Sequence, residues 1–156
     1  MRYFKLGQDR RIPHSVLLTN TNRIGGYEES KGGHLSDLDR VIASTVNSSP
    51  INFYPDILDR QLYMVKGAVK EVFDLFLPEI RYKHCVLLDK PEKKHERYYI
   101  PMLDVFEVNA GRARGLHIFR IKNTKEIEVA ASLEVVEAIL RRNPIGVRIE
   151  TLSLEK

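Results

Sequence analysis

One stretch, from Leu62 to Leu103, constrains the fold more than any other part of this sequence. It opens with a short apolar run rich in β-forming residues, and from Lys66 to Leu77 apolar side chains recur at helical spacing. Pro78 cannot continue that helix, because proline has no backbone N–H and clashes with the preceding turn. Two strand-like segments, residues 82–88 and 98–103, follow across a charged connection. Strands joined in this way pair antiparallel, so the stretch predicts an α+β fold.

A second helix is predicted from Leu133 to Arg142, with Ser132 as its N-cap. Before it, residues 116–121 and 127–131 have the composition of a hairpin. The predicted fold class is therefore α+β, with a mostly antiparallel sheet packed by two main helices at about residues 67–77 and 133–142. After Gly146 a last strand begins in which Val147 and Ile149 share one face, whereas Leu152 and Leu154 take the other. That change of face predicts a bulge or an early strand end near Thr151.

The N-terminal third is harder to interpret. Residues 2–6 alternate weakly like a strand, and 12–18 contain Pro13, which favours an edge strand or an extended segment. Residues 19–49 are polar and rich in glycine, and within them a short helix is predicted at 36–43, where apolar residues share a helical face. A region this long is either a binding loop or flap, or a surface excursion without a role.

Composition indicates a single globular domain spanning residues 1–156, with 43% hydrophobic and 29% charged residues. No apolar run approaches the length of a membrane span, and the first residues lack the apolar core of a signal peptide. The sole cysteine, Cys85, cannot form an internal disulfide. We therefore expect a cytoplasmic protein without contact to a membrane.

No catalytic, cofactor-binding or metal-binding residues are predicted. The five histidines show neither helical i, i+4 pairing nor the Cys/His spacing of a zinc site. His84 and Cys85 are neighbours on a predicted strand, so their side chains point to opposite faces and do not form a nucleophile–base pair. Cys85 is better explained as a small buried apolar residue. The sequence therefore favours a protein that is not an enzyme.

Positive charge gathers in one segment of a chain whose net charge is +4. Between residues 105 and 125 one acid, Glu107, stands against five basic residues: Arg112, Arg114, Arg120, Lys122 and Lys125. This basic 112–125 face is compatible with a nucleic-acid-binding domain, with binding of an acidic protein, or with a solvated surface that has no partner.

Two segments together resemble the immunity-protein-eleven family of bacterial polymorphic toxin systems, long classified as a domain of unknown function. The first holds Pro55-Asp56-Ile57-Leu58, the strand and helix after it, Pro78-Glu79-Ile80, Val86-Leu87-Leu88-Asp89 and Tyr98-Tyr99-Ile100. The second runs from Ser132 through Arg142 and continues with Ile145-Gly146-Val147. The resemblance covers roughly residues 53–152, and its motifs are short and mostly structural.

The resemblance implies a small bacterial cytoplasmic protein that binds and neutralises a cognate toxin protein without catalysis. It brings no catalytic or interface residues with it. From the residues themselves we expect any interface to use the loops at 22–33 and 109–115. Tyr27, Arg112 and Arg114 are the predicted partner-binding residues, because tyrosine and arginine are enriched at energetic hot spots. A homo-oligomer is left open, and nucleic acid is the alternative partner.

Overall fold

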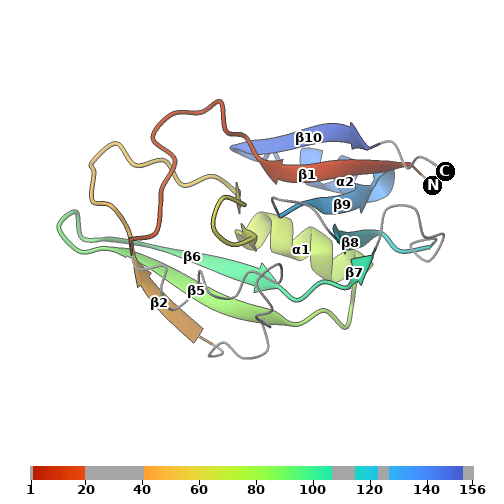
Figure 1. The fold of residues 1–156 in the computed structure, drawn as a ribbon, viewed down its shortest axis with the longest axis horizontal. Coiled ribbons are helices and arrows are strands. Elements are labelled where there is room, and N and C mark those ends of the chain that lie inside the picture. The colour runs from red at the N-terminus through yellow and green to blue at the C-terminus, as the bar shows by residue number, and fades with distance from the viewer. Residues whose placement is uncertain (1, 20–40, 107–114, 123–126, 153–156) are drawn as a thin grey trace.

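The computed structural model describes residues 2–19, 41–106, 115–122 and 127–152 and shows the predicted α+β class. Two five-stranded sheets, ordered β10-β1-β9-β8-β7 and β2-β5-β6-β4-β3, are mostly antiparallel and accompany two helices, as Figure 1 shows. The elements are β1 (Tyr3–Gln8), β2 (Val41–Thr45), β3 (Ile57–Leu58), β4 (Met64–Val65), α1 (Gly67–Phe76), β5 (Tyr82–Asp89), β6 (Lys94–Pro101), β7 (Val105–Phe106), β8 (Ile118–Ile121), β9 (Val129–Ser132), α2 (Leu133–Leu140) and β10 (Val147–Leu152).

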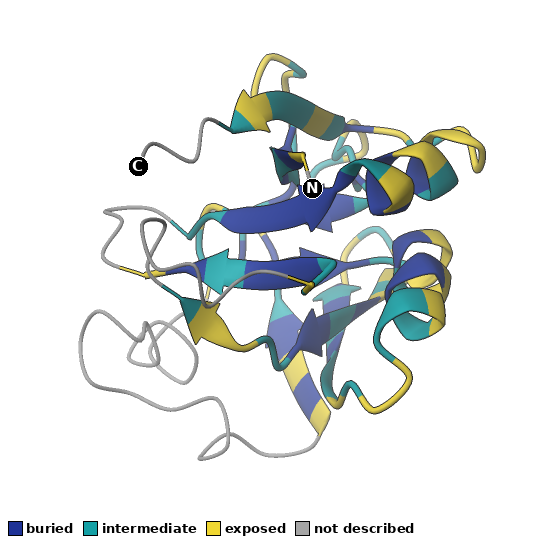
Figure 2. Ribbon diagram, turned by 90° about the vertical axis from the view of Figure 1, so that its right-hand side faces the viewer, coloured by how far each residue is buried: buried dark blue, intermediate teal, exposed yellow. Residues whose placement is uncertain are grey.

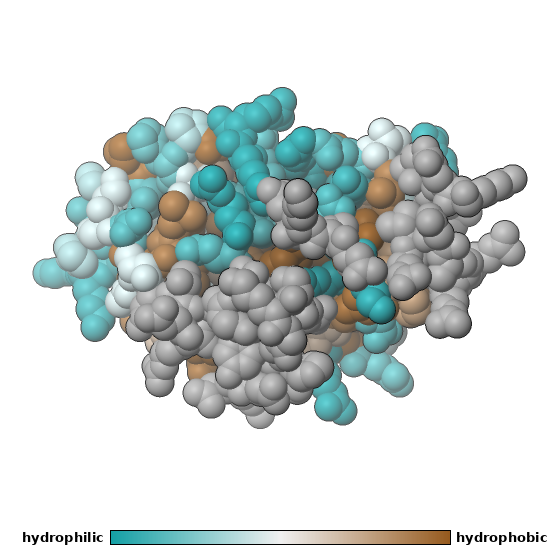
Figure 3. All heavy atoms as spheres, in the orientation of Figure 1, coloured by the Kyte–Doolittle hydropathy of each residue, from teal (hydrophilic) through white to brown (hydrophobic). Residues whose placement is uncertain are grey.

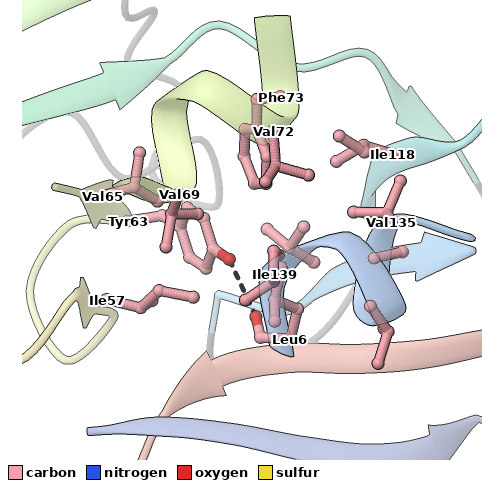
Figure 4. Close-up of a cluster of buried hydrophobic side chains, with 13 residues drawn as sticks. Leu6, Ile57, Tyr63, Val65, Val69, Val72, Phe73, Ile118, Val135 and Ile139 are labelled. Carbon is pink, nitrogen blue, oxygen red and sulfur yellow. Dashed lines mark hydrogen bonds between the residues drawn. The ribbon is translucent and has the colours of Figure 1, made fainter. Parts of the chain in front are cut away.

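The main core joins both sheets and both helices, which lie on the same side of the strands (Figure 2). Figure 4 shows this cluster, to which the first sheet contributes Leu6 and Ile118, and the second Val65. A helix buries an apolar stripe only against other apolar surface, so α1 and α2 together fill the space that the two sheets leave. The division into two sheets is the main feature that the sequence patterns do not indicate.

Helix α1 forms and ends as its sequence predicts. Val69, Val72 and Phe73 recur at helical spacing, and all three are buried in the main core. The helix ends at Phe76, and the N–H of Leu77 donates to the carbonyl of Phe73 at 2.8 Å. The proline that follows stops any continuation of the helix, as expected.

Helix α2 begins as predicted, since the N–H of Val135 donates to the Ser132 hydroxyl at 3.4 Å. It ends two residues earlier than expected, at Leu140, with Arg141 as its C-cap. Asn143 then has a φ of 50° and turns the chain toward β10. The helix is therefore shorter than its apolar pattern and its charged C-terminal side chains indicate.

Of the two features predicted near Thr151, the bulge is wrong, whereas β10 does end close by, with Leu152 as its last residue. Strand β10 pairs with β1 in unbroken antiparallel register from Val147 opposite Gln8 to Leu152 opposite Tyr3. The change of face in the sequence arises because this sheet has apolar clusters on both faces. Val147 and Ile149 pack against the main core, whereas Leu152 packs against a separate cluster of Tyr3, Phe119, Ile121 and Ala130.

Two further expectations are corrected. Residues 41–43, predicted as the end of a short helix, belong to β2, which runs parallel to β5, while residues 36–40 lie outside the described part. Ile42 is buried in the second core with Cys85 and Leu87, so tertiary pairing overrides a weak helical pattern. The connection between β5 and β6 is also shorter than expected, because pairing continues to Asp89 opposite Lys94.

Buried tyrosines tie the sheets and loops together. The hydroxyl of Tyr63 donates to the carbonyl of Leu6 at 2.9 Å and so links the second sheet's β4 region to β1 of the first, as the dashed line in Figure 4 marks. The hydroxyl of Tyr98 donates to the carbonyl of Pro55 at 2.7 Å. Burial raises the pKa of both phenols, because the charged phenolate is poorly solvated inside the protein.

These phenols predict a loss of stability at alkaline pH. The pKa of Tyr63 is higher in the folded than in the unfolded chain, so its contribution is complete below about pH 10 and decreases as pH rises through the folded value. Each such group contributes a slope of at most about 1.4 kcal/mol per pH unit. Urea unfolding from about pH 7 to about pH 11.5 should show Tyr63→Phe with a shallower alkaline decline than the native protein. Equal slopes above about pH 10 would contradict this assignment.

Candidate functional site

A groove of about 700 Å³ lies among the described residues where the end of α1 meets segments of both sheets. Its sides come from the end of α1, the segment leading into β5, the connection from β6 to β7, and the start of β8. Most of its lining is apolar, comprising Phe76, Leu77, Pro78, Ile80, Met102, Leu103, Leu116 and Ile118. In Figure 3 apolar side chains reach the surface in the region where Figure 1 places β7 and β8.

The groove is held in shape by backbone hydrogen bonds that begin where α1 stops. The N–H of Ile80 donates to the carbonyl of Leu77 at 3.0 Å, which turns the chain away from the helix. The N–H of Met102 donates to the carbonyl of Arg81 at 2.9 Å, which joins the two neighbouring sides of the groove. These bonds fix the apolar lining before any ligand arrives, as is usual for binding sites.

Three charged residues, Glu79, Arg81 and Asp104, also line the groove, and all three are exposed. Their side chains can orient a ligand that carries polar groups beside an apolar centre. An apolar cavity with a few charges around it binds through burial of surface and needs no reacting group. The arrangement therefore suits the recognition of a side chain or short segment of another molecule.

Beside the groove, His117 and Ser132 form a close pair whose geometry has a structural explanation. The Nδ1 atom of His117 lies 2.8 Å from the Ser132 hydroxyl, and its ring lies 4.9 Å from that of Phe76 in the groove lining. A serine next to a histidine is the beginning of a nucleophile–base pair. Ser132, however, is fully buried and its oxygen caps α2, so a substrate could not reach it without unfolding the helix start.

The acid closest to this pair in the chain is Glu134, in the first turn of α2. A hydrogen bond from its own backbone N–H is the largest cause that lowers the pKa of Glu134, and the Ser132 hydroxyl and the charge of His117 act in the same direction. A carboxylate at a helix N-terminus also interacts favourably with the helix dipole. The Glu134 carboxylate therefore has a structural role at the N-terminus of α2.

The second candidate pair from the sequence, His84 and Cys85, lies on opposite faces of β5 as expected. Cys85 is buried in the second core, and burial raises the pKa of its thiol to about 11. The ring of His84 packs edge-on against Tyr99 at 5.1 Å on the other face. The interpretation of Cys85 as a small buried apolar residue is confirmed.

The residues predicted to bind a partner cannot be placed in this groove. Tyr27, Arg112 and Arg114 lie outside the described residues, as do residues 22–33 and 109–114. Of the basic 112–125 face, Arg120 is half-buried on β8 and Lys122 follows that strand, while the other three cations are not described. The groove itself was missed. Met102 and Leu103 were predicted as the end of the strand at 98–103, but β6 ends at Pro101 and both side chains line the groove.

Two observations concern other kinds of site. Within the described ranges, no three His, Cys, Asp or Glu side chains come together in a way that could hold a metal ion. Among the helices of the same ranges, neither α1 nor α2 is long and apolar enough to cross a membrane.

Comparison of the sequence with protein-family models gives no match, and comparison with curated proteins gives none. The resemblance to the immunity-protein-eleven family therefore stays a prediction from the residues quoted above.

Proposed function

We propose that this protein is a non-catalytic binding protein of the immunity type, which takes an apolar element of a cognate bacterial toxin into the groove at the end of α1. The observation that carries the proposal is the groove itself, about 700 Å³ in volume and lined mainly by apolar side chains. Protein partners are typically anchored by one or two large side chains that fill such a hollow. The immunity role and the toxin come from the family resemblance.

The balance of charge around the groove favours a protein ligand over a nucleic acid. Two of the three charged lining residues, Glu79 and Asp104, are acidic, and both would repel a phosphate backbone. Arg81 supplies one cation to pair with an acidic group of the partner. An aromatic or branched side chain flanked by charges of both signs would fit this arrangement.

The decisive variant is Met102→Glu, which places a charge in the groove. Met102 lines the groove and is only half-buried, so the fold should tolerate the change. A carboxylate facing an apolar ligand loses its hydration on binding, so affinity for the partner should decrease at least about tenfold, that is by about 1.4 kcal/mol or more. Affinity is measured by calorimetry with the toxin encoded next to this protein's gene.

The matched control is Ile51→Glu, which makes a similar change at a side chain that is 59% exposed and does not line the groove. It should bind as the native protein does and should protect cells that express the neighbouring toxin. Met102→Glu should lose that protection while keeping the native thermal unfolding temperature. If both variants bound the toxin equally well, the groove would be excluded as the binding site. If the native protein formed no complex with the toxin, the immunity role would be excluded.

A further inference from the structure

Strand β10 forms one edge of the first sheet, because no strand in the described part of the chain pairs with its outer side. It lies along the upper border of the molecule in Figure 1 and is paired with β1 over all six of its residues. An open edge of this length presents backbone donors and acceptors that another extended strand can use.

The backbone groups that point outward can be assigned from the ladder. The N–H of Asp9 donates to the carbonyl of Gly146 at 2.9 Å, in the same antiparallel register that continues through β10. Hydrogen bonds in such a ladder fall on alternate residues, so the backbone groups of Arg148 and Glu150 point toward β1. Those of Val147, Ile149 and Thr151 therefore point outward, at the open edge.

Charge selects which register a second strand can take. Arg148 and Glu150 share a face, their side chains are 51% and 41% exposed, and they form an ion pair with each other. Suppose that Ile149 lies opposite Ile149 of a second copy. The outward-pointing backbone groups of the two strands can then form hydrogen bonds with one another, and Arg148 of each copy lies opposite Glu150 of the other. A shift by one step of the ladder would instead place Arg148 opposite Arg148, or Glu150 opposite Glu150, which is unfavourable.

We propose that the β10 edge is the interface of a two-fold symmetric dimer of this chain, with the two β10 strands paired antiparallel about Ile149. A two-fold interface must be self-complementary, and the Arg148–Glu150 pattern meets that condition in this register. The backbone hydrogen bonds supply affinity, and the charges fix the register. A strand this short buries less surface than the roughly 1,600 Å² of a standard interface, so dimerisation should occur at micromolar or higher concentrations.

The test uses complementary charge reversals, measured by sedimentation velocity at low salt. In Arg148→Glu the introduced glutamate of each copy lies opposite Glu150 of the other, and Glu150→Arg likewise sets two arginines opposite one another. Each single variant should therefore bind itself at least about tenfold more weakly than the native chain binds itself. An equimolar mixture of the two variants should restore the dimer. In the mixed dimer one strand carries two glutamates and the other two arginines, so both cross-strand pairs between positions 148 and 150 are of opposite charge.

Arg148 is exposed and Glu150 is half-buried with its side chain 41% exposed, and circular dichroism should show native secondary structure for each variant. Amide exchange gives a second measurement. The N–H groups of Val147, Ile149 and Thr151 should become protected as protein concentration rises, whereas those of Arg148 and Glu150 should be protected at every concentration.

A native protein that stays monomeric at about 1 mM, well above the expected range, or a mixture that fails to dimerise while both single variants are folded, would overturn the proposal. Either result would leave the proposed role of the groove unaffected.

Discussion

Phe73→Ala should lower the free energy of unfolding by about 3–5 kcal/mol. The Phe73 ring is fully buried in the main core, between α1 and the residues that both sheets contribute. Its removal leaves a cavity that the surrounding side chains cannot close, because strands fix their positions on two sides. Urea unfolding followed by circular dichroism measures the loss directly.

Leu75→Ala, two residues further along the same helix, is the matched control. Leu75 is 66% exposed, and leucine and alanine both favour helix, so the change should alter stability by no more than about 0.5 kcal/mol. The contrast between neighbouring apolar residues tests whether α1 faces the sheets as described. Similar losses for the two variants would mean that the helix is rotated or that the core is not the one described.

The second large effect is expected at Gly146, where backbone conformation and crowding act together. Its φ is 72°, and a Cβ atom there would lie 2.5 Å from the Cβ of Pro55 and 3.0 Å from the Phe53 ring. Next to it, Ile145 and Asp56 exchange hydrogen bonds, with the N–H of Ile145 donating to the Asp56 carboxylate at 2.8 Å. The chain therefore has little room to move, and Gly146→Ala should cost about 2–4 kcal/mol in stability.

Gly115→Ala separates the two causes. Gly115 has a comparable φ of 87°, but a Cβ atom there would have no neighbour within 4 Å among the described residues other than those next to it in the chain. Its substitution should therefore show the backbone contribution alone, about 1–2 kcal/mol. The excess loss at Gly146, read from the shift of the urea midpoint, measures the contact with Pro55 and Phe53. If Gly115→Ala were as destabilising as Gly146→Ala, crowding at Gly146 would not be the cause.

The parts of the fold that the sequence predicts are those governed by local rules. The apolar period places α1 and α2, Ser132 marks the start of α2, and Pro78 limits the end of α1. The hairpin of β8 and β9 follows from two strand-like runs near each other in the chain. In each case the residues that decide the structure lie within a few positions of one another.

What could not be predicted depends on pairing between distant segments. Parallel pairing with β5 makes residues 41–45 a strand although their own pattern is ambiguous. The crowding at Gly146 depends on Pro55, which no local signal links to it. The groove could not be predicted for the same reason. Its lining residues come from separate parts of the chain, residues 76–81 on one hand and residues 102–104, 116 and 118 on the other. The sequence thus indicated both helices and several of the strands, and its expectation for the partner-binding residues stays a prediction because those residues lie outside the described part of the chain.

The position of β1 has a consequence for synthesis of the chain. This strand, made of residues 3–8, is hydrogen-bonded on one side to residues 130–132 and on the other to residues 147–152. During translation β1 therefore emerges from the ribosome well before either of its partners and stays unpaired until residues 130–132 and then 147–152 have followed it. The hairpin of β5 and β6 can form much earlier, so the second sheet should begin to assemble first and the first sheet should close only after its final strand has emerged.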